Sequence, residues 1–203
     1  ANLDSKIEKF NKMRIFFKHS FDLDHTNRNS SHEKETIILD IITLAENNKI
    51  KRIIIEDLID GVASDLKKNI SIRSVKDLLI YSYRVAGTVG LMMSKILKVK
   101  NKESLKGAID LGIAMQLTNI ARDVCEDKRR NRQYINHDFS SIRAIINESQ
   151  TFYEKSFKSI SSIPIKSRFA VIVARRVYRK INDYILKQKN IDNYNKAGKI
   201  YVP

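Results

Sequence analysis

The sequence predicts an all-α helical bundle, and three observations lead to this fold class. Glycine and proline, which interrupt helices, occur only 6 and 2 times in 203 residues. Apolar residues recur at three- and four-residue spacing in several segments, which places them on one face of a helix. No segment shows the sustained apolar–polar alternation that is typical of strands. The length suits one domain with a large core, and we expect residues 1–203 to form it.

The predicted helices are bounded by residues that favour caps and turns. Ser74 followed by Asp77 is a capping box, which marks the start of one helix, and Pro164 marks a break between two others. The polar segment 22–31 and the tail after residue 190 are expected to be loops. The apolar pattern predicts helices over about residues 5–20, 33–46, 53–68, 75–98, 103–130, 141–159 and 166–187.

The last two predicted helices should each bury one apolar face. For the segment 141–159 the expected inner residues are Ile142, Ile145, Ile146, Phe152, Tyr153 and Phe157. For the segment 166–187 they are Phe169, Ile172, Val173, Val177, Ile181 and Ile185.

One helix carries a stripe of polar side chains in an otherwise apolar segment. Gln116, Asn119, Asp123 and Asp127 are separated by three, four and four residues, so they return to nearly the same helical face. Mg²⁺ often binds one or two carboxylates and leaves positions for water and substrate phosphates. Two Asp residues on a helix are usually solvated, but the apolar neighbours of this stripe indicate that it faces a cavity.

A cluster of cations adjoins the two carboxylates. Arg122 lies beside Asp123, and Lys128, Arg129, Arg130 and Arg132 follow. A carboxylate pair beside guanidinium groups suits a ligand that is a metal-bound anion, most simply a diphosphate.

Gly87 and Gly90 interrupt the predicted helix over residues 75–98. Each glycine inside a helix costs about 1 kcal/mol relative to alanine. A helix usually keeps such a glycine because another helix, or a ligand, comes so close to the backbone that a Cβ atom would exclude it. Both explanations are compatible with the sequence.

The overall charge and the single cysteine limit the functional class. A net charge of +15 invites a nucleic-acid interpretation, but Lys, Asn and Ile are frequent throughout the sequence and no nucleic-acid-binding signature is present. Basic charge also attracts anionic lipid headgroups, so peripheral membrane association stays an alternative. No apolar run of about 18 residues predicts a membrane span. The lone Cys125 fits a reducing, cytoplasmic compartment. The oligomeric state is not predicted.

Two segments, YSYRVAGTVGLMM (81–93) and AIDLGIAMQLTNIARDVCEDKRRNRQYI (108–135), resemble the squalene and phytoene synthase family of head-to-head prenyl synthases. Weaker similarity lies in residues 57–66 and 174–181. The segment VAGTVGLMM (85–93) is more similar to phytoene synthases than to squalene synthases. The resemblance implies a class I isoprenoid synthase bundle around a central cavity. It also implies condensation of two geranylgeranyl diphosphates to phytoene, a carotenoid precursor, through a cyclopropyl diphosphate.

The resemblance also implies roles for particular residues. Asp123, Asp127 and Asn119 would bind Mg²⁺, or Mn²⁺ in its place, with Gln116 and Tyr81 beside the reacting centre. The substrate-binding positions that it implies are Val85, Gly87, Gly90, Arg122, Arg132, Tyr134 and Asp65.

One feature of the family is not found in the sequence. The family has a first aspartate-rich motif on an earlier helix, and we find none upstream of the segment 5–20. The expectation is therefore a chain that lacks an N-terminal helix and is inactive alone, with truncation at the C-terminus as a further alternative. Two alternatives to phytoene synthesis also stay open. One is a squalene or dehydrosqualene synthase that uses farnesyl diphosphate, with NADPH only if squalene is the product. The other is a non-catalytic assembly protein.

Overall fold

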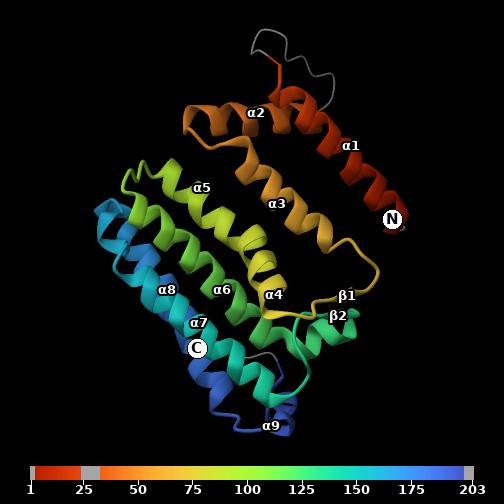
Figure 1. Cartoon of the computed structure of the whole chain (residues 1–203), viewed down its shortest axis with the longest axis vertical. Helices are drawn as coiled ribbons and strands as arrows, with labels where there is room; N and C mark the ends of the chain where they lie inside the picture. The colour runs from red at the N-terminus through yellow and green to blue at the C-terminus, as the bar shows by residue number, and fades with distance from the viewer. Residues whose placement is uncertain (1–2, 24–32, 199–203) are drawn as a thin grey trace.

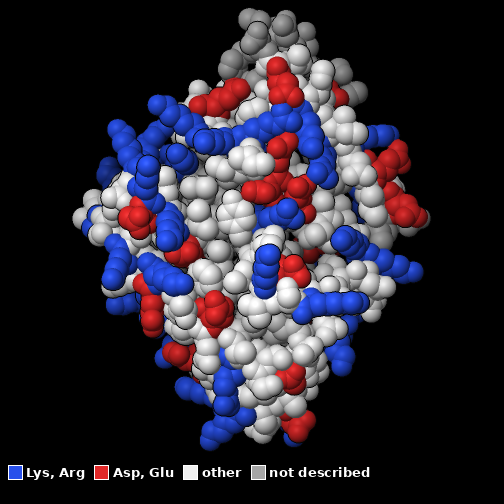
Figure 2. Space-filling model, viewed as in Figure 1, with Lys and Arg blue, Asp and Glu red and all other residues white. Residues whose placement is uncertain are grey.

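The computed structural model describes residues 3–23 and 33–198, and most of these residues are helical. The predicted all-α bundle is confirmed (Figure 1). No helix in these two ranges is long and apolar enough to cross a membrane. Lys and Arg side chains are spread over the face seen in Figure 2, with carboxylates among them.

The first helices pack around a small apolar core of their own. They are α1 (Leu3–Phe21), α2 (Glu33–Asn47) and α3 (Arg52–Ser64). Phe17, Ile42 and Ile55 are buried where the three helices meet. The ion pair between Arg14 and Asp60 ties α1 to α3. The helix predicted over 53–68 ends early, which leaves Asp65 as the C-cap of α3.

The predicted helix over residues 75–98 consists of three pieces. Helix α4 (Val75–Ser82) continues through a π-helical turn, η2 (Tyr83–Gly87), into α5 (Thr88–Ile96). The predicted capping box is confirmed, because the hydroxyl of Ser74 accepts a hydrogen bond of 3.0 Å from the backbone N–H of Asp77. Single π turns inside helices often accompany functional sites.

Helix α6 (Lys102–Arg129) is the central element of the bundle. Figure 1 shows it between α4 and α5 on one side and α7 (Phe139–Phe157) and α8 (Ile165–Leu186) on the other. A short 3₁₀ turn, η3 (Ile160–Ser162), joins α7 to α8. Leu117, Ile142 and Ile185 are fully buried in the main core.

The absence of strands was predicted wrongly. The two-residue strands β1 (Ile70–Ser71) and β2 (Arg132–Gln133) form a parallel pair that links the loop after α3 to the loop after α6. Strands of two residues are too short to produce an alternating pattern.

The tail was also predicted wrongly, because it contains helix α9 (Ile191–Ala197). Asn190 caps α9, and its side chain accepts a hydrogen bond from the N–H of Asn193. Tyr194 is buried, and its hydroxyl lies 2.9 Å from the Ala121 carbonyl oxygen and 2.7 Å from that of Arg122. This tertiary anchor stabilises a helix that local propensity does not predict.

The inner face of α8 was predicted correctly only at its C-terminal end. Ile181 and Ile185 are buried, whereas Phe169 is 75% exposed and Val173 and Val177 are 41% and 40% exposed. Residues four apart advance by ~40° around a helix. The apolar stripe therefore turns out of the core toward the start of α8. Phe157 of α7, also expected inside, is 57% exposed.

Candidate active site

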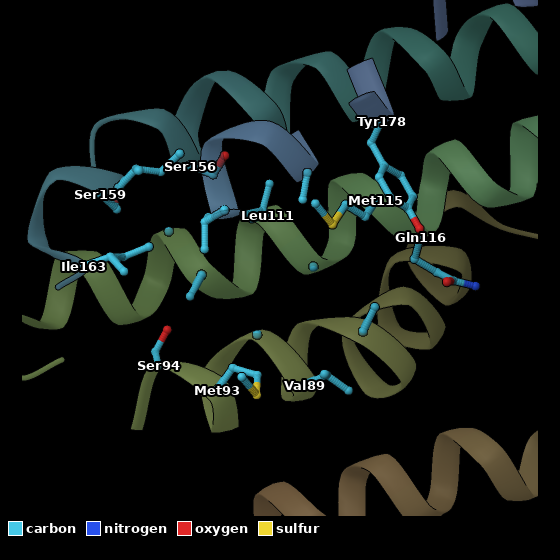
Figure 3. Close-up of a pocket in the computed structure, with 18 of the residues that line it drawn as sticks. Val89, Met93, Ser94, Leu111, Met115, Gln116, Ser156, Ser159, Ile163 and Tyr178 are labelled. Carbon is cyan, nitrogen blue, oxygen red and sulfur yellow. The ribbon is translucent and has the colours of Figure 1, made fainter. Parts of the chain in front are cut away.

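A cavity of about 370 Å³ runs along α6. Its walls come from η2 and α5 on one side and from α7, η3 and α8 on the other (Figure 3). Most of the lining is apolar, with Val89, Met93, Leu111 and Met115 among the wall residues. A cavity of this kind suits a long apolar ligand.

The predicted polar stripe on α6 reaches this cavity. Gln116 and Asn119 both line it. The side-chain oxygen of Asn119 is buried and has no hydrogen-bond partner among the described residues. An unpaired buried oxygen is costly, so this atom is a candidate ligand for a cation or a donor group.

The two carboxylates of the stripe lie one and two turns beyond Asn119 on α6. Arg122 donates to Asp123 through two hydrogen bonds, of 2.8 Å from Nε and 2.7 Å from Nη2. Asp127 is half-buried, and burial, together with the nearby charge of Asp123, raises its pKa to about 6. Arg132 and Tyr134 line a small pocket together with Asp127. The structure therefore brings the predicted carboxylates and guanidinium groups together at one end of α6.

No cluster of three or more His, Cys, Asp or Glu side chains within 3–23 and 33–198 is arranged to hold a metal ion. In this part of the protein, the candidate metal ligands are the two carboxylates of Asp123 and Asp127 and the amide oxygen of Asn119.

Tyr81, Asp65 and Tyr134 form a hydrogen-bonded group. Tyr81 donates to one oxygen of Asp65 at 2.9 Å, and Tyr134 donates to the other at 2.8 Å. The two rings are stacked, with centroids 4.9 Å apart. Burial is the main cause that raises the pKa of both tyrosines, to about 12 for Tyr134. Both hydroxyls are therefore neutral hydrogen-bond donors at physiological pH.

Three of the predicted substrate-binding residues, Val85, Gly87 and Gly90, take two different positions. Val85 and Gly90 line the cavity. Gly87 is buried, and a Cβ atom at this position would lie 3.0 Å from the Tyr83 ring and 3.1 Å from Ile109. At Gly90 a Cβ atom would lie 2.2 Å from the carbonyl oxygen of Ala108. Close helix approach therefore accounts for both glycines, and Gly90 contacts the cavity as well.

Tyr178 of α8 is a cavity residue that the sequence did not single out. It lines the cavity, and Figure 3 shows its side chain reaching from α8 toward Gln116 of α6. It lies in the segment 174–181, whose similarity to the prenyl synthases was the available signal. The helical pattern of α8 gave no indication that this residue faces the cavity.

The architecture and the site agree with one known family. A family model described as squalene/phytoene synthase matches residues 3–141, which is more than half of the chain. The chain belongs to this family. All the predicted site residues lie within the matched region, whereas Tyr178 lies outside it.

Several phytoene synthases are similar in sequence to this family member. The 15-cis-phytoene synthase of Paracoccus sp. is 34% identical over 149 residues, which are 64% of this chain and 49% of that protein. The corresponding enzyme of Pantoea ananas is 34% identical over 62% of this chain and 47% of its own length. Chloroplastic phytoene synthase 1 of Solanum lycopersicum is 33% identical over 70% of this chain and 40% of its own length. The protein thus spans about half the length, or less, of these curated relatives.

Two solved structures of the squalene/phytoene synthase fold superpose on most of the protein. Squalene synthase HpnC from Alicyclobacillus acidocaldarius gives a TM-score of 0.69 at 15% identity, covering 93% of this chain and 75% of that one. A dehydrosqualene synthase in complex with ligand gives 0.65 at 25% identity, covering 91% and 78%. The first likeness concerns the fold alone.

Proposed function

We propose that the protein joins two prenyl diphosphates head to head and that its substrate is geranylgeranyl diphosphate, with phytoene as the product. The observation that carries this proposal is an apolar cavity whose one end meets the polar stripe of α6. A prenyl diphosphate has the same two parts, a long apolar tail and a charged head. The relatives named phytoene synthase favour the C20 substrate.

The residues at the polar end fit Mg²⁺. Asn119 offers a buried oxygen without a partner, and the raised pKa of Asp127 indicates a carboxylate whose negative charge is poorly compensated. Carboxylate and amide oxygens are ligands that Mg²⁺ accepts, and Mn²⁺ accepts similar ones. Asp123, Asp127 and Asn119 would hold the ion, which when bound supplies Lewis-acid assistance to departure of the diphosphate.

The other polar residues would bind and orient the diphosphates. The guanidinium groups of Arg122 and Arg132 lie beside the carboxylates and can donate paired hydrogen bonds to phosphate oxygens. Tyr81 and Tyr134, held neutral by burial, can donate hydrogen bonds without adding charge.

The proposed reaction begins when the C1–O bond of one allylic diphosphate breaks. The C2–C3 double bond of the second substrate attacks C1, and loss of a proton closes a cyclopropylcarbinyl diphosphate. Departure of the second diphosphate, rearrangement to the 1-1′ linkage and loss of another proton complete a C40 hydrocarbon. The apolar walls would exclude water that captures the cations, and the ring of Tyr178, which lines the cavity, would stabilise positive charge.

The direct test is incubation of the full-length protein with Mg²⁺ and either geranylgeranyl or farnesyl diphosphate, followed by chromatography of the hydrocarbons. We expect a C40 product from the C20 substrate. Asp123→Asn should lower the rate by ~10- to 100-fold while the helical circular dichroism is kept. The matched control is Asp183→Asn, because the carboxylate of Asp183 is exposed on α8. Absence of hydrocarbon from both substrates would contradict an enzymatic function.

Farnesyl diphosphate is the second candidate substrate, because the dehydrosqualene synthase structure superposes on 91% of this protein. A C30 product formed faster than the C40 product would favour it. Equal and negligible turnover by the wild type and Asp123→Asn would instead favour an assembly protein.

A further inference from the structure

We infer that helix α9 holds the carboxylate-bearing end of α6 in helical form and that Tyr194 of α9 is a positioning residue for the site there. The hydroxyl of Tyr194 acts on the backbone of α6 rather than on the carboxylates of Asp123 and Asp127. The inference rests on the proposed function, because it concerns the proposed site for Mg²⁺ and diphosphate.

The end of α6 that carries the carboxylates has two electrostatic reasons to fray. Asp123 and Asp127 are four residues apart, and like charges at this spacing destabilise a helix. Glu126 and Asp127 also lie in the last turn of α6, where the helix dipole disfavours negative charge. The ion pair between Arg130 and Glu126 is partly exposed, so it offsets only a small part of this cost. Helix ends also open easily in general, and this one therefore needs support from outside the helix.

Helix α9 supplies support on the opposite face of α6. Ala121 and Cys125 each lie about 160° around the helix from Asp123. Tyr194 is 1% exposed, and its hydroxyl lies 2.9 Å from the carbonyl oxygen of Ala121 and 2.7 Å from that of Arg122. Since a hydroxyl has one proton, the two oxygens share one hydrogen bond. Both carbonyls belong to the turn that leads into Asp123, so the bond holds that turn from behind.

A second contact joins α9 to the same part of α6. The thiol of Cys125 donates to the side-chain oxygen of Asn195 at 2.9 Å. The Nε2 atom of His137, in the loop before α7, lies 3.2 Å from that oxygen and 3.5 Å from the sulfur of Cys125. Figure 1 shows α9 at the lower end of the bundle. Three segments, α6, this loop and α9, therefore meet behind the carboxylates.

The proposed site depends on the helical form of this end of α6. Asn119, Asp123 and Asp127 share one face only while α6 stays helical. If the last turn frays, Asp127 leaves that face. A ligand that binds only the helical form binds more weakly in proportion to the fraction of molecules that have lost it. Tyr194 therefore strengthens binding without touching the ligand.

The test removes the hydroxyl of Tyr194 and keeps its ring. In the full-length protein, Tyr194→Phe should weaken the binding of inorganic diphosphate with Mg²⁺, measured by calorimetry, by roughly 3- to 10-fold, because one hydrogen bond is lost. In the metal-free protein, the backbone amides of residues 123–129 should exchange with solvent faster by a similar factor. The second readout needs neither activity nor a bound ion.

Two further variants separate positioning from general stability. Tyr153→Phe is the matched control, because Tyr153 is also buried and its hydroxyl lies 3.0 Å from that of Thr118 on α6. It should lower the overall stability about as much and leave diphosphate binding and the exchange of residues 123–129 unchanged. Asn190→Ala removes the cap of α9 and alters no residue of α6. It should shift both readouts in the same direction as Tyr194→Phe.

The outcomes separate the two proposals. If wild type binds diphosphate and the folded variants Tyr194→Phe and Asn190→Ala bind it equally well, α9 does not hold the site and this inference alone fails. Equal weakening by Tyr153→Phe would show a general loss of stability and would also overturn the positioning role. If wild type itself binds no diphosphate in the presence of Mg²⁺, the proposed function fails and this inference falls with it.

Discussion

Replacing Asp127 by Asn should make the metal-free protein more stable at pH 8. Asp127 is half-buried on α6, and its pKa is raised from 3.8 to about 6, first by burial and then by the charge of Asp123. The folded protein therefore disfavours the ionised form of Asp127 more than the unfolded chain does. Asparagine keeps the shape of the side chain and removes the charge.

The size of the effect follows from the shift of the pKa. Two units at 1.36 kcal/mol each give about 3 kcal/mol, and partial solvent access reduces this to ~1–2 kcal/mol. For a raised pKa, the stabilising contribution is fully present below the unfolded value near 4 and is lost as the pH rises through about 6. The advantage of Asp127→Asn should therefore be complete at pH 8 and disappear near pH 4.

The measurement is urea unfolding in a chelator at pH 8 and pH 4, with Asp40→Asn on the exposed face of α2 as the control. Equal or lower stability of Asp127→Asn at pH 8 would refute the assignment of a buried, poorly compensated carboxylate.

Adding Mg²⁺ with inorganic diphosphate should raise the melting temperature of the wild type, because a ligand stabilises the state that binds it. The same addition should leave Asp127→Asn unchanged.

Two further predictions concern residues that organise the site. Asp65→Asn should lower the free energy of unfolding by about 1–3 kcal/mol, because Asp65 accepts hydrogen bonds from both tyrosines. Tyr81→Phe removes its bond to Asp65 and the 3.2 Å bond from the Tyr81 hydroxyl to that of Tyr134, but it keeps the bond from Tyr134 to Asp65. A loss as large as that of Asp65→Asn would therefore contradict the role of Asp65 as acceptor for both tyrosines. Gly90→Ala should destabilise by about 1–3 kcal/mol, because the added Cβ atom meets the backbone of α6 at 2.2 Å. In an unobstructed helix this change stabilises by about 1 kcal/mol, so a rise in melting temperature would contradict the close helix contact.

The sequence predicted where the candidate site residues that share one helix would lie. The spacing of Gln116, Asn119, Asp123 and Asp127 depends only on the period of α6, and the apolar neighbours indicated a cavity. The structure confirms the cavity beside the first two residues. The start of α4 was predictable for the same reason, since the capping box of Ser74 is local in sequence.

Features that depend on distant residues could not be predicted in this way. Tyr134 and Asp65 are 69 positions apart, and the β1–β2 pair brings their segments together. The contact that fixes α9 joins Tyr194 to a carbonyl 73 positions earlier. The apolar pattern of α8 gives a period, but it does not say which turns have a neighbouring helix to cover them.

Two glycines bring helix backbones close together beside the cavity along α6. At Gly90 the backbone of α5 approaches Ala108 of α6, and at Gly112 an added Cβ atom would lie 2.3 Å from the carbonyl oxygen of Ala86. Where two helix backbones are this close, the larger side chains must lie to either side of the contact. The 370 Å³ cavity adjoins this contact, and a second apolar cavity of about 420 Å³ lies beside α1, α2 and α3. Val89 and Met93 of α5 line both. An alanine at Gly90 should therefore change the shape of the cavity along α6 as well as the stability of the bundle, because Gly90 both lines that cavity and contacts the α6 backbone.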